Sequence, residues 1–171
     1  MTLLVCPLSQ VETARALHRP SHLISLLSPT DDKAWPVSEA DDAHLRLAFH
    51  DIARARKGLT APDAALVARL LDFAAGWDPA RPMLVHCWAG VSRSTAAGFI
   101  IACQHAPRRS ERDIARALRA AAPYATPNGL LVSLADAALG RAGRMSAAIA
   151  EIGRGADAFE GALFELPFGN V

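Results

Sequence analysis

The sequence has few cysteines, no long apolar run and almost no net charge. Its three cysteines, at positions 6, 87 and 103, form no CxxC pair, so we expect neither a disulfide framework nor a zinc or redox motif. No stretch approaches the roughly 18 consecutive apolar residues of a membrane span, and the first ten residues lack the basic start of a signal peptide. A net charge of +1 gives no broad field for nucleic acid or an anionic membrane. We therefore expect a soluble cytoplasmic protein that binds neither.

What the sequence does contain is an alternation of short apolar runs and helix-like segments. Apolar runs typical of buried strands span 3–8, 22–27, 44–49 and 82–87. Helical patterns cover 10–17, a segment from an N-cap at Thr60 to Gly76, 94–104, 111–122, 126–139 and 143–155. Residues 28–42 are expected to form a loop, and the residues after 160 a loosely attached end. The alternation predicts one α/β domain over 1–171, with three α/β/α layers around a mostly parallel sheet of four or five strands.

One loop joins the last predicted strand to the helix that follows it, in the stretch VHCWAGVSRST. Cys87 ends the strand, and Gly90 permits a tight turn, so that the backbone N–H groups of residues 88–93 can point into one concavity at a helix N-terminus. Arg93 adds a planar guanidinium suited to two phosphate oxygens. The same donors favour a thiolate at Cys87, beneath a bound phosphate and in line for attack on phosphorus. The alternative is a structural cysteine of the core, which is the usual role of a lone cysteine beside an apolar run.

This stretch resembles the signature loop of cysteine-dependent protein tyrosine phosphatases, in the dual-specificity form HCxAGxSRS, and the chain is similar to small bacterial tyrosine phosphatases of that fold. The resemblance implies that Cys87 is the nucleophile and Arg93 the phosphate clamp. It also implies that His86 orients the loop and helps activate the cysteine, and that the Ser94 hydroxyl bonds to the thiolate as it leaves in the second step. By the same resemblance, phosphate is bound by the loop residues Trp88, Ala89, Gly90, Val91, Ser92 and Arg93.

Phosphocysteine formation expels an alkoxide or phenoxide, which an acid must protonate. The family uses an aspartate from a separate upstream loop. Asp51 directly follows the strand 44–49, and ligands of a parallel sheet lie beyond the carboxyl ends of its strands, so Asp51 is expected at the same edge as Cys87. A plain surface aspartate stays the alternative. The other candidate aspartates precede a strand or belong to a helix: Asp41, Asp42, Asp63, Asp72 and Asp78.

Four further points complete the prediction. The stretch TPNGLLVSLAD (126–136) resembles the proline–asparagine segment of dual-specificity phosphatases, which implies that Asn128 braces the signature loop. The glutamine that often positions water in that family is absent, and Ser133 is the nearest residue. A regulatory disulfide of Cys87 with Cys6 or Cys103 stays open, as does the role of the Trp88 ring, in substrate stacking or in packing.

The sequence thus predicts a phosphomonoester hydrolase, first of all a protein tyrosine phosphatase with dual specificity left open, acting on a phosphorylated protein or peptide. No cofactor is implied, and no metal is expected because no histidine pair has ligand spacing. One alternative is the same chemistry on a phosphoinositide, a nucleotide or an RNA 5′ end, although the loop lacks the lysines common in lipid-directed relatives. Another is a phosphate-binding module with little turnover. The oligomeric state cannot be predicted.

Overall fold

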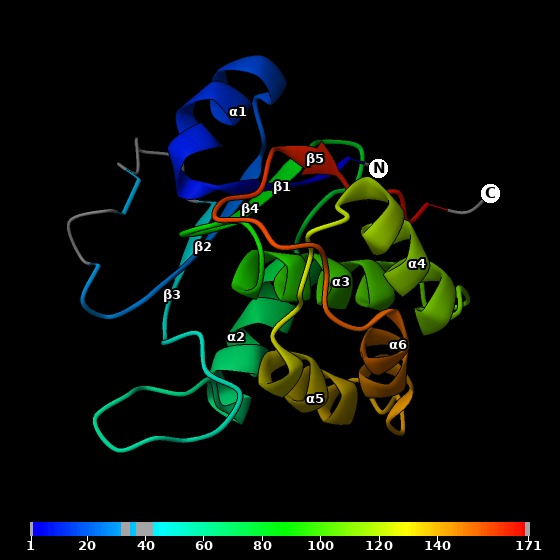
Figure 1. Ribbon diagram of the computed structural model, residues 1–171. Helices are drawn as coiled ribbons and strands as arrows, with labels where there is room; N and C mark the ends of the chain where they lie inside the picture. Colours follow the sequence, from blue (N-terminus) through cyan, green and yellow to red (C-terminus); the bar gives the residue numbers. More distant parts are fainter. Residues whose placement is uncertain (1, 32–34, 37–42, 170–171) are drawn as a thin grey trace.

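The computed structural model describes residues 2–31, 35–36 and 43–169 and contains a five-stranded sheet with helices on both faces (Figure 1). The strands run in the order β3-β2-β4-β1-β5, and all neighbours are parallel except β5, which is antiparallel to β1. This confirms the predicted three-layer α/β architecture. The strand bounds are β1 Leu3–Pro7, β2 His22–Leu27, β3 His44–Ala48, β4 Met83–Cys87 and β5 Phe164–Glu165.

The helices divide unequally between the two faces of the sheet. Helix α1 covers one face, and α2 to α6 gather on the other, with α3 against the sheet (Figure 1). Their bounds are α1 Val11–His18, preceded by the 3-10 turn η1 Leu8–Gln10, α2 Ala64–Ala75, α3 Arg93–His105, α4 Glu111–Ala121, α5 Gly129–Ala138 and α6 Arg144–Ile152. None of the helices in the described ranges combines the length and apolarity needed to cross a bilayer.

The side chains of β1 alternate between two cores, as the two-residue period of a strand requires. Leu3 belongs to the large core beneath α3 and Val5 faces Gly98 of that helix, whereas Leu4 and Cys6 belong to the small core beneath α1. The central strand β4 is buried along its whole length, and Cys87 faces the large core. Since β1 to β4 are parallel, their carboxyl ends meet at one edge of the sheet, where the signature loop follows Cys87.

The start of α2 differs from the prediction. Its N-cap is Asp63, not Thr60, because the Asp63 carboxylate accepts a hydrogen bond from Leu66 N at 2.8 Å. Thr60 is paired elsewhere: its N–H donates to His50 Nδ1 at 2.9 Å and its carbonyl accepts from His50 N at 2.8 Å. These two bonds close the loop that carries Asp51.

The end of the chain is also different from the loosely attached segment that we expected. Strand β5 pairs with β1, and Leu166 N donates to Leu3 O at 2.8 Å. Leu166 and Phe168 are buried in the large core. The segment was missed because a two-residue strand carries almost no periodic signal. Most of the predicted loop 28–42 lies outside the described residues, and so do Asp41 and Asp42.

Candidate active site

The signature loop is held from outside through its carbonyl groups. Four of them accept backbone hydrogen bonds from other segments: Trp88 O from Leu8 N (3.0 Å), Ala89 O from Gly161 N (2.8 Å), Val91 O from Thr126 N (2.9 Å) and Ser92 O from Asn128 N (3.3 Å). The N–H groups of residues 89–93 donate no hydrogen bond within the described ranges. The carbonyl groups of the loop are therefore bonded to other segments, and its N–H groups remain as donors at the start of α3. Such a set of N–H groups at a helix N-terminus is suited to binding an anion.

Gly90 allows the loop to turn this tightly against the end of β1. Its φ angle is +71°, a conformation that favours glycine, and a Cβ atom there would lie 2.7 Å from Pro7 N. Both the turn and the close approach therefore require glycine at this position.

Cys87 lies at the base of the loop, buried, with Sγ 3.2 Å from Ser94 Oγ. Ser94 is in the first turn of α3, so its hydroxyl and the N-terminus of the helix face the same sulfur atom. The serine can donate a hydrogen bond to a thiolate and withdraw it when the sulfur becomes bonded.

Arg93 is only 6% exposed, and part of its guanidinium is already bound. Its Nη1 donates to Phe49 O at 3.0 Å and to Ser28 Oγ at 3.2 Å, both just past the ends of neighbouring strands. Its Nε is buried without a partner in the described chain. A buried N–H of a cation without an acceptor is costly, and a bound anion would satisfy it.

Asp51 lies beside the signature loop, as the strand order predicts. Its Oδ1 accepts hydrogen bonds from Ser92 Oγ at 2.8 Å and from Asn128 Nδ2 at 2.7 Å. Its Oδ2 accepts none in the described part of the chain. Asn128 also donates to Ile52 O at 3.3 Å, and its Oδ1 caps α5 by accepting from Leu131 N. One carboxylate oxygen is thus anchored to the signature loop and to α5, and the other is free.

A chain of three hydrogen-bonding side chains lies on the α1 face of the sheet, behind Cys87. His86 Nδ1 is 3.3 Å from Cys87 O, His86 Nε2 is 2.5 Å from Ser25 Oγ, and Ser25 Oγ is 2.8 Å from His44 Nε2. A carbonyl only accepts, so His86 Nδ1 carries the hydrogen, its Nε2 accepts from Ser25, and Ser25 accepts from His44.

Both histidines of this chain favour the neutral form. Burial lowers the pKa of His86 to about 4, and the nearby His44 and Arg93 act in the same direction, against the hydrogen bond to Cys87 O. Burial, with the charges of Arg46 and Arg15, lowers the pKa of His44 to about 4. Neutral rings preserve the tautomers that this hydrogen-bond chain requires.

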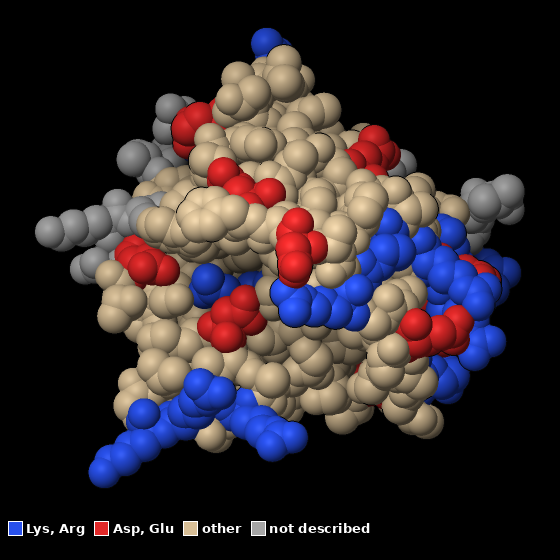
Figure 2. Space-filling model, in the orientation of Figure 1, with Lys and Arg blue, Asp and Glu red and all other residues tan. Residues whose placement is uncertain are grey.

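Most of the predicted site residues come together at this edge of the sheet, whereas His86 lies behind them. Figure 2 shows a hollow on one face of the molecule, with basic atoms inside it and acidic atoms at its rim. Sequence reasoning missed two partners, Ser28 and Ser25. Ser28 follows the strand 22–27 and could have been found by the rule that selected Asp51. Ser25 is opposite His86 only because of the strand register.

The other two cysteines are placed differently from Cys87. Cys6 lies on the opposite face of the sheet, in the core under α1, and Cys103 is buried in α3. Burial raises the pKa of each to about 12, with the proximity of Cys87 adding to the effect at Cys6. All three thiols are free. In the described ranges, no three histidine, cysteine or acidic side chains converge as metal ligands would.

Comparison with known proteins identifies the fold. No family model matches the sequence, and no curated protein matches it significantly. PTPMT1 aligns with 82% of this chain and 94% of its own length, at a TM-score of 0.60 and 18% identity. The human tyrosine phosphatase-like serine/threonine/tyrosine-interacting protein gives a TM-score of 0.61 over 82% and 92% of the two chains, at 16% identity. DUSP15 gives 0.59 over 87% and 90%, at 20% identity. The chain therefore has the dual-specificity-like fold of cysteine-dependent phosphatases, which confirms the resemblance at the level of the fold.

Proposed function

We propose that the protein hydrolyses phosphate monoesters through a phosphocysteine intermediate and acts as a protein tyrosine phosphatase. The observation that carries this proposal is the buried Arg93, whose Nε has no partner among the described residues, in the same loop as the buried Cys87 and five backbone N–H groups that donate no hydrogen bond there. Phosphate binding and nucleophile activation would use the same donors.

In the first step the phosphate dianion binds the N–H groups of the signature loop and the free edge of the Arg93 guanidinium. The Cys87 thiolate attacks phosphorus in line, forming the S–P bond while the P–O bond to the leaving group breaks. Asp51, held by Ser92 and Asn128 through Oδ1, donates its proton from Oδ2 to the departing oxygen.

In the second step water attacks the phosphocysteine. The Asp51 carboxylate accepts a proton from that water, the O–P bond forms and the S–P bond breaks. Ser94 Oγ, 3.2 Å from the sulfur, donates a hydrogen bond to the departing thiolate. Neither step needs a metal, so turnover should survive a chelator.

The substrate class separates this proposal from its alternatives. PTPMT1 has been solved in complex with PI(5)P, so an inositol phosphate is one competitor. The signature loop of this chain offers Trp88, Ala89, Val91 and Ser92 where a headgroup with several phosphates would be bound better by lysines. A phosphate-binding module without turnover is the other competitor.

Steady-state turnover tests the proposal. The wild-type protein, with chelator present, should hydrolyse an aryl phosphate and a phosphotyrosyl peptide. Cys87→Ser should lose turnover to the background rate and still bind the peptide in fluorescence anisotropy. Cys103→Ala, which alters another buried thiol, should retain turnover.

Three results would contradict the proposal. Full activity in Cys87→Ser would show that Cys87 is not the nucleophile. Binding without turnover in the wild type would favour the phosphate-binding module. A higher kcat/KM for an inositol phosphate than for any phosphopeptide would reassign the substrate.

A further inference from the structure

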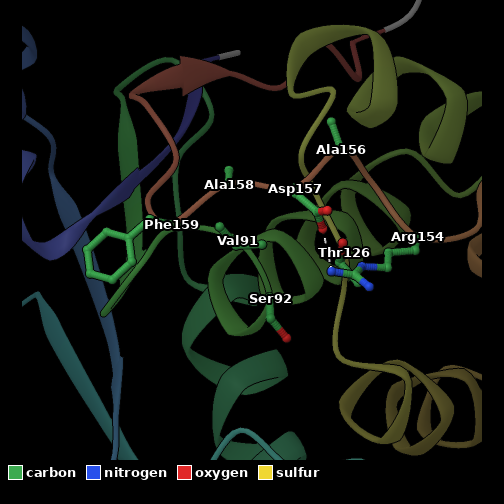
Figure 3. Close-up of a pocket in the computed structure, with 8 residues that line it drawn as sticks. All are labelled: Val91, Ser92, Thr126, Arg154, Ala156, Asp157, Ala158 and Phe159. Atoms are coloured by element: carbon green, nitrogen blue, oxygen red, sulfur yellow. Dashed lines mark hydrogen bonds and ion pairs between the residues drawn. The ribbon is translucent and has the colours of Figure 1, made fainter.

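The segment between α6 and β5 crosses the signature loop, and we name residues 156–163 the entrance strap (Figure 3). It is fixed at both ends. Ala156 N donates to Pro123 O at 3.0 Å, and near the other end Gly161 N donates to Ala89 O in the signature loop at 2.8 Å. Ala162 N donates to the Tyr124 hydroxyl at 2.8 Å. These hydrogen bonds give the entrance strap a defined position beside the signature loop.

The residues in the middle of the strap are exposed, and two of their side chains are paired, Asp157 with Arg154 and Glu160 with Ser9. In residues 157–160, no backbone N–H or C=O group makes a hydrogen bond within the described ranges. Phe159 is 96% exposed. Leaving a phenyl ring in water is unfavourable, and its burial against a bound ligand would be stabilising. Together with the half-exposed Trp88 ring, Phe159 forms an exposed apolar patch beside the candidate active site, which is a feature of interaction surfaces.

Phe159 separates two cavities at the entrance of the site. The first, of about 400 Å³, is lined mainly by apolar groups and has the half-exposed Trp88 ring in its wall. The second, of about 480 Å³, has a mixed polar and apolar lining and contains the Arg154–Asp157 ion pair (Figure 3). We name the first cavity the apolar groove; its lining is Leu8, Ser9, Trp88, Ala89, Phe159 and Glu160.

The apolar groove adjoins the signature loop, because Trp88 and Ala89 belong to both. A substrate held by its phosphate would therefore bring the groups next to the ester close to Trp88 and Phe159. The unpaired backbone of residues 157–160 fits an extended peptide, which can supply hydrogen-bond partners that an acyl chain lacks. Glu160 at the groove disfavours an acidic neighbour.

On this basis we propose that the apolar groove binds a large apolar side chain next to the phosphorylated residue of a peptide, against the rings of Trp88 and Phe159. This rests on the proposed function for the identity of the phosphate site, and it adds the substrate sequence that the site selects.

Two phosphotyrosyl peptides that differ only in one residue next to the phosphotyrosine, leucine in one and the uncharged asparagine in the other, test the proposal. The wild-type kcat/KM should favour the leucine peptide by about 10- to 100-fold, the effect of burying one leucine side chain. Phe159→Ser should bring that ratio close to one. The ratio is insensitive to a general loss of turnover. The control is Leu17→Ser, which removes another exposed apolar side chain, on α1, and should keep the wild-type ratio.

Equal kcat/KM for the two peptides, or an unchanged ratio in Phe159→Ser, would overturn the inference. So would a long-chain alkyl phosphate that is hydrolysed faster than the leucine peptide and loses this advantage in Phe159→Ser, because the groove would then hold an acyl chain.

Anisotropy with the same peptides on Cys87→Ser separates this inference from the proposed function. Preferential binding of the leucine peptide without wild-type turnover of any ester would end the hydrolase proposal and support the groove. Turnover of both peptides without a preference for leucine would support the hydrolase proposal and end the proposal for the groove.

Discussion

At the scale of single residues, the site depends on side chains whose partners come from other elements. Arg93 is held by Ser28 and by Phe49 O, and Asp51 by Ser92 and Asn128. Within the described residues, Arg93 Nε and Asp51 Oδ2 make no hydrogen bond, so both are available to a substrate. Cys87 and Arg93 could be predicted from sequence because both belong to one short loop. Ser25 could not, because its contact with His86 depends on strand register.

Asp51→Ala should slow hydrolysis by about 10²- to 10⁴-fold for esters with poor leaving groups, because the departing oxygen then lacks its proton donor. For a strongly activated aryl phosphate, which needs no proton, the loss should be much smaller. The measurement is kcat/KM across a series of substituted phenyl phosphates. Asp72→Ala, at an exposed position of α2, is the control. A loss that is the same for every leaving group would contradict a role as general acid.

At the scale of elements, the parts predicted well are those with a long periodic signal. The central strand β4 and the helix α3 are apolar over most of their length and lie close to their predicted ranges. The predicted N-cap of α2, Thr60, was wrong. Thr60 and Asp63 both suit the start of a helix, and only the hydrogen bonds between Thr60 and His50 in the folded chain decide between them. The last strand was missed because its two residues gain their order from β1.

Leu166→Ala tests whether the C-terminal segment is part of the core. This buried side chain packs beneath α3, so its truncation should reduce the free energy of unfolding by about 2–5 kcal/mol. The measurement is equilibrium unfolding in urea, with Glu165→Ala as the control, since Glu165 is the exposed residue directly before Leu166. A change as small as that of the control would mean that the segment is attached loosely, as the sequence alone suggested.

At the scale of the whole molecule, one edge of the sheet carries the site, and the interior behind it is kept neutral. His86 and His44 lie on the α1 face, joined through Ser25 beneath the nucleophile. Their neutral state links the stability of the fold to pH, because the folded protein binds fewer protons than the unfolded chain when pH is below the usual histidine pKa.

Acidification should therefore destabilise the protein before its carboxylates titrate. Burial lowers the pKa of both histidines from 6.5 to about 4 in the folded state. Their contribution is complete above about pH 6.5 and is lost progressively as pH falls towards 4. Thermal unfolding between about pH 7.5 and pH 5 should show a falling Tm, and His44→Gln should reduce the fall. A Tm that is constant over this range would contradict the neutral hydrogen-bond chain.

The most direct test of the account is a chemical search for the phosphorylated enzyme. A phosphotyrosyl peptide is mixed with the Ser94→Ala protein, in which departure of the thiolate should be slowed; the reaction is quenched in acid, and the digested protein is mapped by mass spectrometry. The account predicts one phosphoryl group, on Cys87, that appears during turnover and is absent from Cys87→Ser. Turnover with no phosphate on Cys87, or with phosphate on another residue, would contradict it.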